Sequence, residues 1–253
     1  MRKLTLLLIL LPSLFAHAGE DGSLSLSPAV VMLRGENGQS TTQTLRLVNG
    51  TSRTFSFDLI AEDVVPHDGQ RTFMSAGMVP GSIAATAVFS QKHLDVPPGE
   101  TAIVTITVTL PPATPVRAVR ALFRGTNRVM SGNVPMLASL GALLTFTISG
   151  DVSMTADPLL LQSQSATANF GASHTCTNSG REPLVAKGVM AIVDARGSLV
   201  GRSTLRPQRL LPGESARLGG EYPGELHPGT YRVLLTYDYE GQTLTRSAEV
   251  QVR

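Results

Sequence analysis

The side chains that could carry out catalysis or bind a metal are few and far apart in this sequence. Beyond residue 18 they are four histidines and one cysteine, namely His67, His93, His174, His227 and Cys176. His174 and Cys176 have the spacing of a ligand pair, but a structural zinc site needs four ligands and the sequence has no second pair. Glu62 and Asp63 are adjacent, and adjacent side chains on a strand point to opposite faces, so they cannot act as an acid–base pair.

The common catalytic motifs are also missing from the sequence. It contains no Gly-x-Ser-x-Gly elbow, no phosphate-binding glycine loop and no His-Glu-x-x-His. We therefore expect a protein that is not an enzyme and that needs neither a metal nor another cofactor. Cys176 has no second cysteine with which to form an intrachain disulfide. It is then either buried or a link between two molecules, and we expect it to be buried as a small apolar residue.

One cluster of charge stands out, and it consists of the arginines Arg117, Arg120, Arg124 and Arg128. Residues around Arg120 alternate between apolar and charged as in a strand, which favours a solvated strand face. The other interpretation is a patch that binds carboxylates of a partner protein, because guanidinium groups pair well with them. We keep both interpretations and retain Arg117, Arg120 and Arg124 as candidate partner-binding residues.

Residues 1–18 have the pattern of a secretory signal peptide. Arg2 and Lys3 precede an apolar run, and Ala16-His17-Ala18 forms a small-x-small cleavage site. Without Arg2 and Lys3 the 21 basic residues become 19, equal to the 19 acidic ones, which argues against a nucleic-acid partner. No later stretch is long and apolar enough to span a membrane. We expect export to the periplasm or to the cell surface.

The rest of the chain has the pattern of an all-β protein. In Thr101–Leu110, which follows a Pro-Pro-Gly turn, β-branched residues alternate so that Ile106 falls on a core face and threonines on the other. A weaker copy of this turn and strand begins at Leu211. We predict two tandem immunoglobulin-like β-sandwiches, at residues 19–150 and 151–253. Tyr231, just after Pro-Gly, is typical of a tyrosine corner, and Pro28 predicts an edge strand or one that switches sheets.

The N-terminal half also carries a family resemblance. Its residues are Leu24-Ser-Leu-Ser-Pro-Ala-Val-Val-Met-Leu-Arg-Gly35, Thr44-Leu-Arg-Leu-Val-Asn49 and Leu94-Asp-Val-Pro-Pro-Gly99. Over residues 24–148 this pattern resembles the first domain of PapD-like periplasmic pilus-assembly chaperones. The resemblance implies a non-enzymatic protein that lends a strand to pilus or surface subunits, and an outer-membrane usher as a further partner.

The charged anchors of that family do not carry over to this chain. Its arginine on the first strand aligns with Val30, and its lysine on the last strand of the first domain has no counterpart, since no lysine lies between Lys92 and Lys187. The aromatic-Arg-Pro ending is replaced by Thr147-Ile-Ser-Gly150. The alternative function is therefore a structural or adhesive component of a surface appendage or envelope, with its edges covered.

The last strand of the first domain, Leu137–Ile148, is the predicted binding strand. Its stronger apolar stripe, which we expect to face the core, is Leu140, Ala142, Leu144, Phe146 and Ile148. The opposite stripe would then face a partner, so that the candidate partner-binding residues are Leu143, Thr145 and Thr147. We expect no small-molecule substrate.

Overall fold

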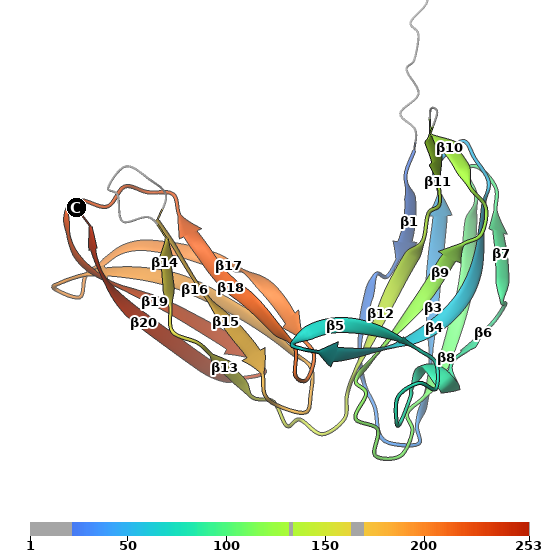
Figure 1. Cartoon of the computed structure of the whole chain (residues 1–253), viewed down its shortest axis with the longest axis horizontal. Helices are drawn as coiled ribbons and strands as arrows, with labels where there is room; N and C mark the ends of the chain where they lie inside the picture. Colours follow the sequence, from blue (N-terminus) through green and yellow to red (C-terminus); the bar gives the residue numbers. More distant parts are fainter. Residues whose placement is uncertain (1–21, 132–133, 163–169, 253) are drawn as a thin grey trace, which may run out of the picture.

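The computed structural model describes residues 22–131, 134–162 and 170–252, and these are nearly all β-strand (Figure 1). The predicted signal peptide, residues 1–18, lies outside the described residues. One short 3-10 helix, Ala84–Thr86, interrupts the strands. None of the described helices is long enough or apolar enough to cross a membrane.

Two facing sheets make up the first half of the chain. One has the order β1 (Leu24–Ser27), β3 (Ser40–Asn49), β8 (Thr101–Thr109) and β6 (Val88–Phe89). The other has the order β2 (Val30–Arg34), β12 (Leu140–Thr147), β9 (Ala118–Gly125), β4 (Phe55–His67) and β5 (Gln70–Ser75), and β7 (His93–Val96) also pairs with β4. A separate hairpin joins β10 (Val129–Ser131) to β11 (Val134–Met136).

Two further sheets make up the second half. In one, β15 (Phe170–Asn178) pairs with β13 (Met154–Ala156), β14 (Leu160–Gln162) and β18 (Ser215–Tyr222). The other has the order β17 (Leu199–Leu210), β16 (Leu184–Asp194), β19 (Gly229–Tyr239) and β20 (Gln242–Val252). The prediction of two β-sandwiches in tandem is confirmed. No described strand pairing crosses Gly150, which is where we propose the domain boundary.

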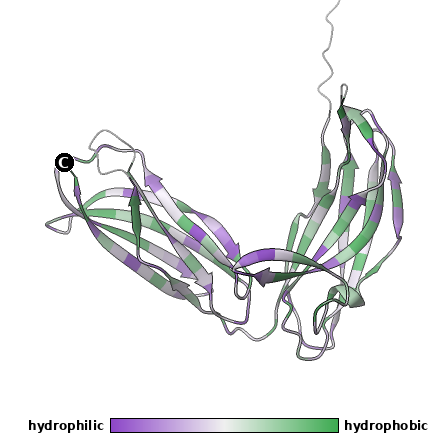
Figure 2. Ribbon diagram, viewed as in Figure 1, coloured by the Kyte–Doolittle hydropathy of each residue, from purple (hydrophilic) through white to green (hydrophobic). Residues whose placement is uncertain are grey.

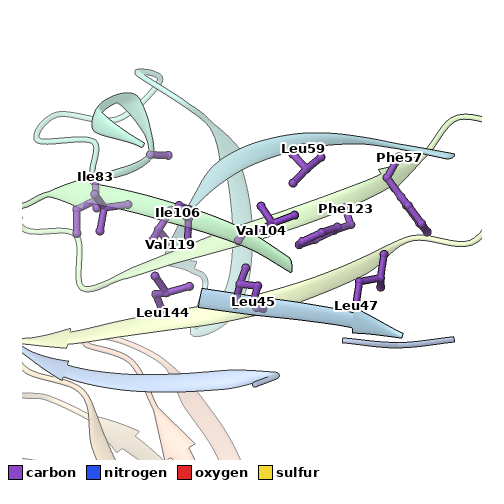
Figure 3. Close-up of a cluster of buried hydrophobic side chains, with 14 of the residues drawn as sticks. Leu45, Leu47, Phe57, Leu59, Ile83, Val104, Ile106, Val119, Phe123 and Leu144 are labelled. Carbon is purple, nitrogen blue, oxygen red and sulfur yellow. The ribbon is translucent and has the colours of Figure 1, made fainter. Parts of the chain in front are cut away.

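Alternating apolar residues explain the first core. Leu45 and Leu47 of β3 and Val104 and Ile106 of β8 point inward and meet Phe123 of the facing sheet (Figure 3). All five are fully buried, as predicted for Ile106. The outer face of β3 and β8 is lined by hydroxyls that bond in cross-strand pairs, each at 2.7 Å: Ser40 with Thr109, and Thr42 with Thr107.

The first strand switches sheets at Pro28. β1 pairs antiparallel with β3, and after the cis Ser27–Pro28 bond β2 pairs parallel with β12 of the facing sheet. Both interpretations of Pro28 hold, because the chain switches sheets there and β1 and β2 each form the edge of a sheet. As a result β2 covers one side of β12, and it does so only over Leu143–Thr147 in the described register.

A tyrosine corner and a buried cysteine mark the second core. The hydroxyl of Tyr231 donates a hydrogen bond of 2.8 Å to the carbonyl of His227, the contact that the Pro-Gly-Thr-Tyr sequence predicts. Cys176 is fully buried among apolar residues, as predicted, and burial raises the pKa of its thiol to about 12. Such a thiol is inert at neutral pH.

Candidate functional site

β11 lies at the tip of the first domain (Figure 1), and it belongs to a strand edge that has no partner strand among the described residues. On one side β12 pairs with β9 from Leu140 onward, while on the other side its pairing with β2 begins at Leu143. Before it in the chain, β11 pairs antiparallel with β10 in a separate two-stranded sheet. Within the described chain, residues 134–142 therefore have no strand on their second side, and we call them the donor edge.

The donor edge carries exposed apolar side chains. Its even-numbered residues continue the core-facing stripe of β12 outward: Ala142 is buried, Leu140 and Ala138 are half-buried, and Met136 and Val134 are 48% and 61% exposed. The hydrophobic colour of the ribbon follows β12 and β11 to the tip (Figure 2). Exposed apolar groups in a row on an unpaired edge are typical of a surface that awaits a partner.

Two close contacts hold the donor edge against β9. The Ser139 hydroxyl accepts a hydrogen bond of 3.1 Å from the backbone N–H of Gly125. A Cβ atom on Gly125 would lie 2.1 Å from the carbonyl oxygen of Ala138. Glycine is therefore required at this position, because any side chain would push residues 138 and 139 away from β9.

The three predicted partner-binding residues of β12 lie elsewhere. Leu143 is half-buried against the cluster of Val64, Ala118 and Leu211, the last of which belongs to the second domain, and Thr145 is 1% exposed. Thr147 is half-buried beside the domain linker. The prediction of the core stripe holds for Ala142, Leu144 and Phe146. The outer stripe is partly covered by the chain itself, which a strand pattern cannot show, and a role of its three residues in partner binding stays a prediction.

The predicted arginine candidates are paired within the chain. Arg117 binds the buried carboxylate of Glu182 at 3.1 Å. Arg120 binds Glu62 through two nitrogens, and its guanidinium lies 3.5 Å from the centre of the Phe73 ring.

The outermost of these arginines, Arg124, lies 3.3 Å from Asp58 on the surface. Hydrogen bonds from His93 and then from Arg124 lower the pKa of Asp58. In this structure Arg117, Arg120 and Arg124 thus form ion pairs within the chain, and their role in partner binding stays a prediction.

Two sets of hydrogen bonds and ion pairs join the two domains, and we call them the first tie and the second tie. In the first, the Glu182 carboxylate accepts bonds from the N–H groups of Ile148 and Ser149, at 2.9 and 3.0 Å, and from the Ser149 hydroxyl at 2.7 Å, besides Arg117. These contacts fix the end of β12. The orientation of the donor edge therefore depends on the second domain as well as on β9.

The second tie is the β4–β5 hairpin, which reaches across to the second domain (Figure 1). The N–H of Ser215 donates to the carbonyl of Gly69 at 2.7 Å, and Arg71 binds Glu214 at 2.9 Å. Gly69 has φ of 72°, and a Cβ atom there would lie 3.0 Å from the Ser215 hydroxyl. The sequence turn His67–Gln70 thus has a position that favours glycine for two reasons.

Among the described residues, no group of three or more His, Cys, Asp or Glu side chains could hold a metal ion. His174 lies beside Cys176 in sequence, but both nitrogens of its ring are occupied: Nδ1 donates to the Asp157 carbonyl at 3.1 Å, and Nε2 accepts from the Tyr237 hydroxyl at 3.0 Å. That arrangement fits a neutral ring, the form that burial favours by lowering the pKa of His174.

The buried imidazole of His174 predicts a loss of stability in acid. Burial, together with the charge of Arg246, lowers its pKa in the folded protein, although the Asp157 carbonyl opposes this. As the pH falls through about 6.5, the unfolded chain binds a proton that the folded chain does not, so the free energy of unfolding decreases. Urea unfolding between pH 8 and 5 should show this decrease, and it should be smaller in His174→Gln. The exposed His67→Gln is the control, and equal slopes in both variants would contradict the assignment.

The sequence pattern does not predict the donor edge, because it places the start of the last strand of the first domain at Leu137. The structure places β11 at Val134–Met136 and the start of β12 at Leu140. The sequence does contain evidence for this strand, since Val134, Met136 and Ala138 continue the apolar even-numbered stripe of β12. Pro135 masked it, although proline is tolerated in an edge strand.

Comparison with known proteins gave matches among solved structures alone. No protein-family model matches the chain, and no curated protein matches it. The class 5 fimbriae chaperone CfaA is 13% identical, with a TM-score of 0.49 over 89% of this chain and 98% of CfaA. The E. coli chaperone DraB is 16% identical, with a TM-score of 0.42 over 90% and 98%. The CsuC–CsuE chaperone–tip adhesion subunit complex of Acinetobacter baumannii is 8% identical, with a TM-score of 0.42 over 78% and 89%.

Proposed function

We propose that the protein is a non-enzymatic chaperone that binds partner polypeptides by strand addition at the donor edge. The observation that carries this proposal is the uncovered edge of residues 134–142 with exposed Val134 and Met136. Backbone groups on such an edge can pair with any extended segment, and alternate apolar side chains select a partner that has a matching groove.

The length of the edge limits what it can hold. Nine residues in extended conformation span about 30 Å, and β2 closes the edge at Leu143. A partner strand can therefore pair along residues 134–142 and must end where β2 begins. The even-numbered side chains would then lie in the partner's core as a continuation of this protein's own core.

The class of partner follows from the same features. An incomplete β-sandwich that lacks one strand has both an unpaired edge and an apolar groove, which are the complements of the donor edge. Pilus or surface subunits are the partners implied by the family resemblance, and an outer-membrane usher is the further partner we propose. A structural or adhesive component would have this edge covered within its own assembly, so the uncovered edge favours the chaperone.

Export to the periplasm is part of the proposal. The leader pattern of residues 1–18 supports it, and the intact mass of the exported protein tests it. The mass expected is that of a chain beginning at Gly19. A mass that includes Met1–Ala18 would remove the basis for a periplasmic partner.

Met136→Arg should reduce the recovery of co-purifying subunits by about tenfold or more, because a charge would enter the partner's apolar groove. Its own melting temperature should not change, since Met136 is half-exposed and outside the core. Affinity purification from periplasmic extract, followed by mass spectrometry, measures the recovery.

The matched control for that variant is Leu137→Arg. Leu137 is as exposed as Met136 but belongs to the odd-numbered residues of the donor edge. Recovery of the same subunits should remain near the wild-type level. If both variants lose the subunits equally, or if neither does, the even-numbered stripe does not select the partner.

A further inference from the structure

The methionines of this chain differ sharply in how far solvent reaches them. Met154 and Met190 lie in the second core and are 4% and 0% exposed, so burial protects their thioethers from oxidants in solution. Four others have side chains that are between 47% and 68% exposed: Met32, Met78, Met130 and Met136. An exposed thioether is open to attack by a peroxide or by hypochlorous acid, which converts it to a polar sulfoxide.

Met136 is the one exposed methionine that belongs to the donor edge. It lies on β11 in the even-numbered stripe, between Val134 and Ala138. The hydrocarbon side chains of the other residues in that stripe do not react with such oxidants. Strand addition would place this stripe in the apolar groove of a partner. The stripe therefore contains a single position that an oxidant can convert from apolar to polar.

Met130 provides a matched comparison within the same hairpin. In the pairing of β10 with β11, Met130 lies opposite Pro135 and Val129 lies opposite Met136, so the two methionines point to opposite faces of the hairpin. Their side chains are 49% and 48% exposed, and an oxidant should therefore reach both. Only Met136 points to the face that would meet a partner.

The single thiol of the chain cannot sense the same oxidants. Cys176 is fully buried, and burial raises the pKa of its thiol to about 12. The thiolate is the form that oxidants attack, and it is scarcely populated at neutral pH. Any response of the folded protein to a mild oxidant must therefore come from its exposed methionines.

We propose that Met136 is a site of reversible oxidation and that its sulfoxide prevents strand addition at the donor edge. The inference rests on the proposed function, because it names a means of regulating that same edge. A sulfoxide oxygen is a hydrogen-bond acceptor, and it would lie without a donor in the partner's apolar groove. A partner that is already bound covers Met136 and so protects it from the oxidant.

The oxidation transfers one oxygen atom. In its reaction with hypochlorous acid, the sulfur of Met136 gives up two electrons and forms a bond to oxygen, while the O–Cl bond breaks and chloride and a proton are released. Reduction by a methionine sulfoxide reductase takes two electrons from a dithiol, which becomes a disulfide, and the oxygen leaves as water. The thioether is thereby restored, so the same chain can bind again.

The test begins by defining a set of polypeptides that depend on the even-numbered stripe. These are the ones that the wild-type protein recovers from periplasmic extract and Met136→Arg does not. Purified wild-type protein is then treated with hypochlorous acid until peptide mapping shows that Met136 and Met130 are oxidised, and circular dichroism verifies that it is still folded.

Recovery of this set by the oxidised protein should fall at least about tenfold, as expected when a polar group is buried without a partner. It should return after treatment with two methionine sulfoxide reductases, one for each sulfoxide epimer. Unchanged recovery by folded protein that carries oxidised Met136 would overturn the proposal. Recovery that stays low after Met136 is reduced would also overturn it.

Two variants assign the effect to one sulfur atom, through the ratio of recovery after oxidation to recovery before it. In Met136→Leu this ratio should stay near one, because leucine has no sulfur to oxidise. In Met130→Leu it should fall as in the wild type. Equal ratios in the two variants would overturn the assignment to Met136.

The same experiment separates a failure of this inference from a failure of strand addition. If Met136→Arg recovers every polypeptide that the wild type recovers, none depends on the even-numbered stripe, and both proposals fall. If Met136→Arg loses a set that the oxidised wild-type protein keeps, strand addition stands and the regulation by oxidation falls.

Discussion

Ile106→Asp should unfold the first β-sandwich. Ile106 lies at the centre of β8 between Gln43 of β3 and Phe89 of β6, and its side chain is fully buried in the core. A carboxylate placed there has no partner in the described core, and burying it costs several kcal/mol, on the order of the 5–15 kcal/mol by which a whole domain is stable. Circular dichroism during heating should show the loss of the cooperative transition.

The control for Ile106→Asp lies three residues away on the same strand. Ile103 is 56% exposed on the outer face of β8, beside the row of threonines. Ile103→Asp should change the free energy of unfolding by about 0.5 kcal/mol or less, as is usual for surface substitutions. Equal destabilisation by both variants would mean that the two faces of β8 are not distinguished by burial.

Glu182→Ala should destabilise the protein by about 3–5 kcal/mol, because it leaves the buried Arg117 guanidinium without its counter-charge. It also removes the acceptor for the N–H groups of Ile148 and Ser149. Glu182 is fully buried, so water cannot replace these bonds without opening the domain junction. Urea unfolding, monitored by circular dichroism, measures the change.

A neighbouring ion pair provides the control for Glu182→Ala. Asp151 and Arg181 lie 2.7 Å apart in the same turn region, with their side chains 48% and 79% exposed. Asp151→Ala should therefore cost no more than about 1 kcal/mol. If the two substitutions had similar effects, the burial of Glu182 would not be what makes its ion pair important.

The sequence was sufficient for those features that depend on a single strand or turn. The alternation of apolar and polar residues predicts that Ile106 and Phe146 lie in the core. A tyrosine directly after Pro-Gly-Thr predicts the tyrosine corner at Tyr231. Pro28 marked the strand that changes sheets. These features are local, because each follows from a period of two or from the backbone restriction of one residue.

The site could not be predicted in the same way because it depends on contacts between distant segments. The strand pattern leaves Leu143 free to meet a partner, but Leu143 packs against a cluster that includes Leu211, which lies 68 residues later in the sequence. Arg117 appeared to belong to an open patch, but Glu182 of the other domain neutralises it. Polar and charged residues carry no period that reveals their partners, so a pattern can locate a strand without showing what covers it.

The β4–β5 hairpin also determines how the two domains lose their structure. Because its tip binds the turn before β18 while Leu211 of the second domain lies buried against Val64 and Ala118, unfolding either sandwich exposes apolar surface on the other. The free energy of this interface then belongs to both domains at once. Heat should therefore melt the chain in a single cooperative transition. A destabilising substitution in the core of one sandwich should also lower the stability of the other sandwich.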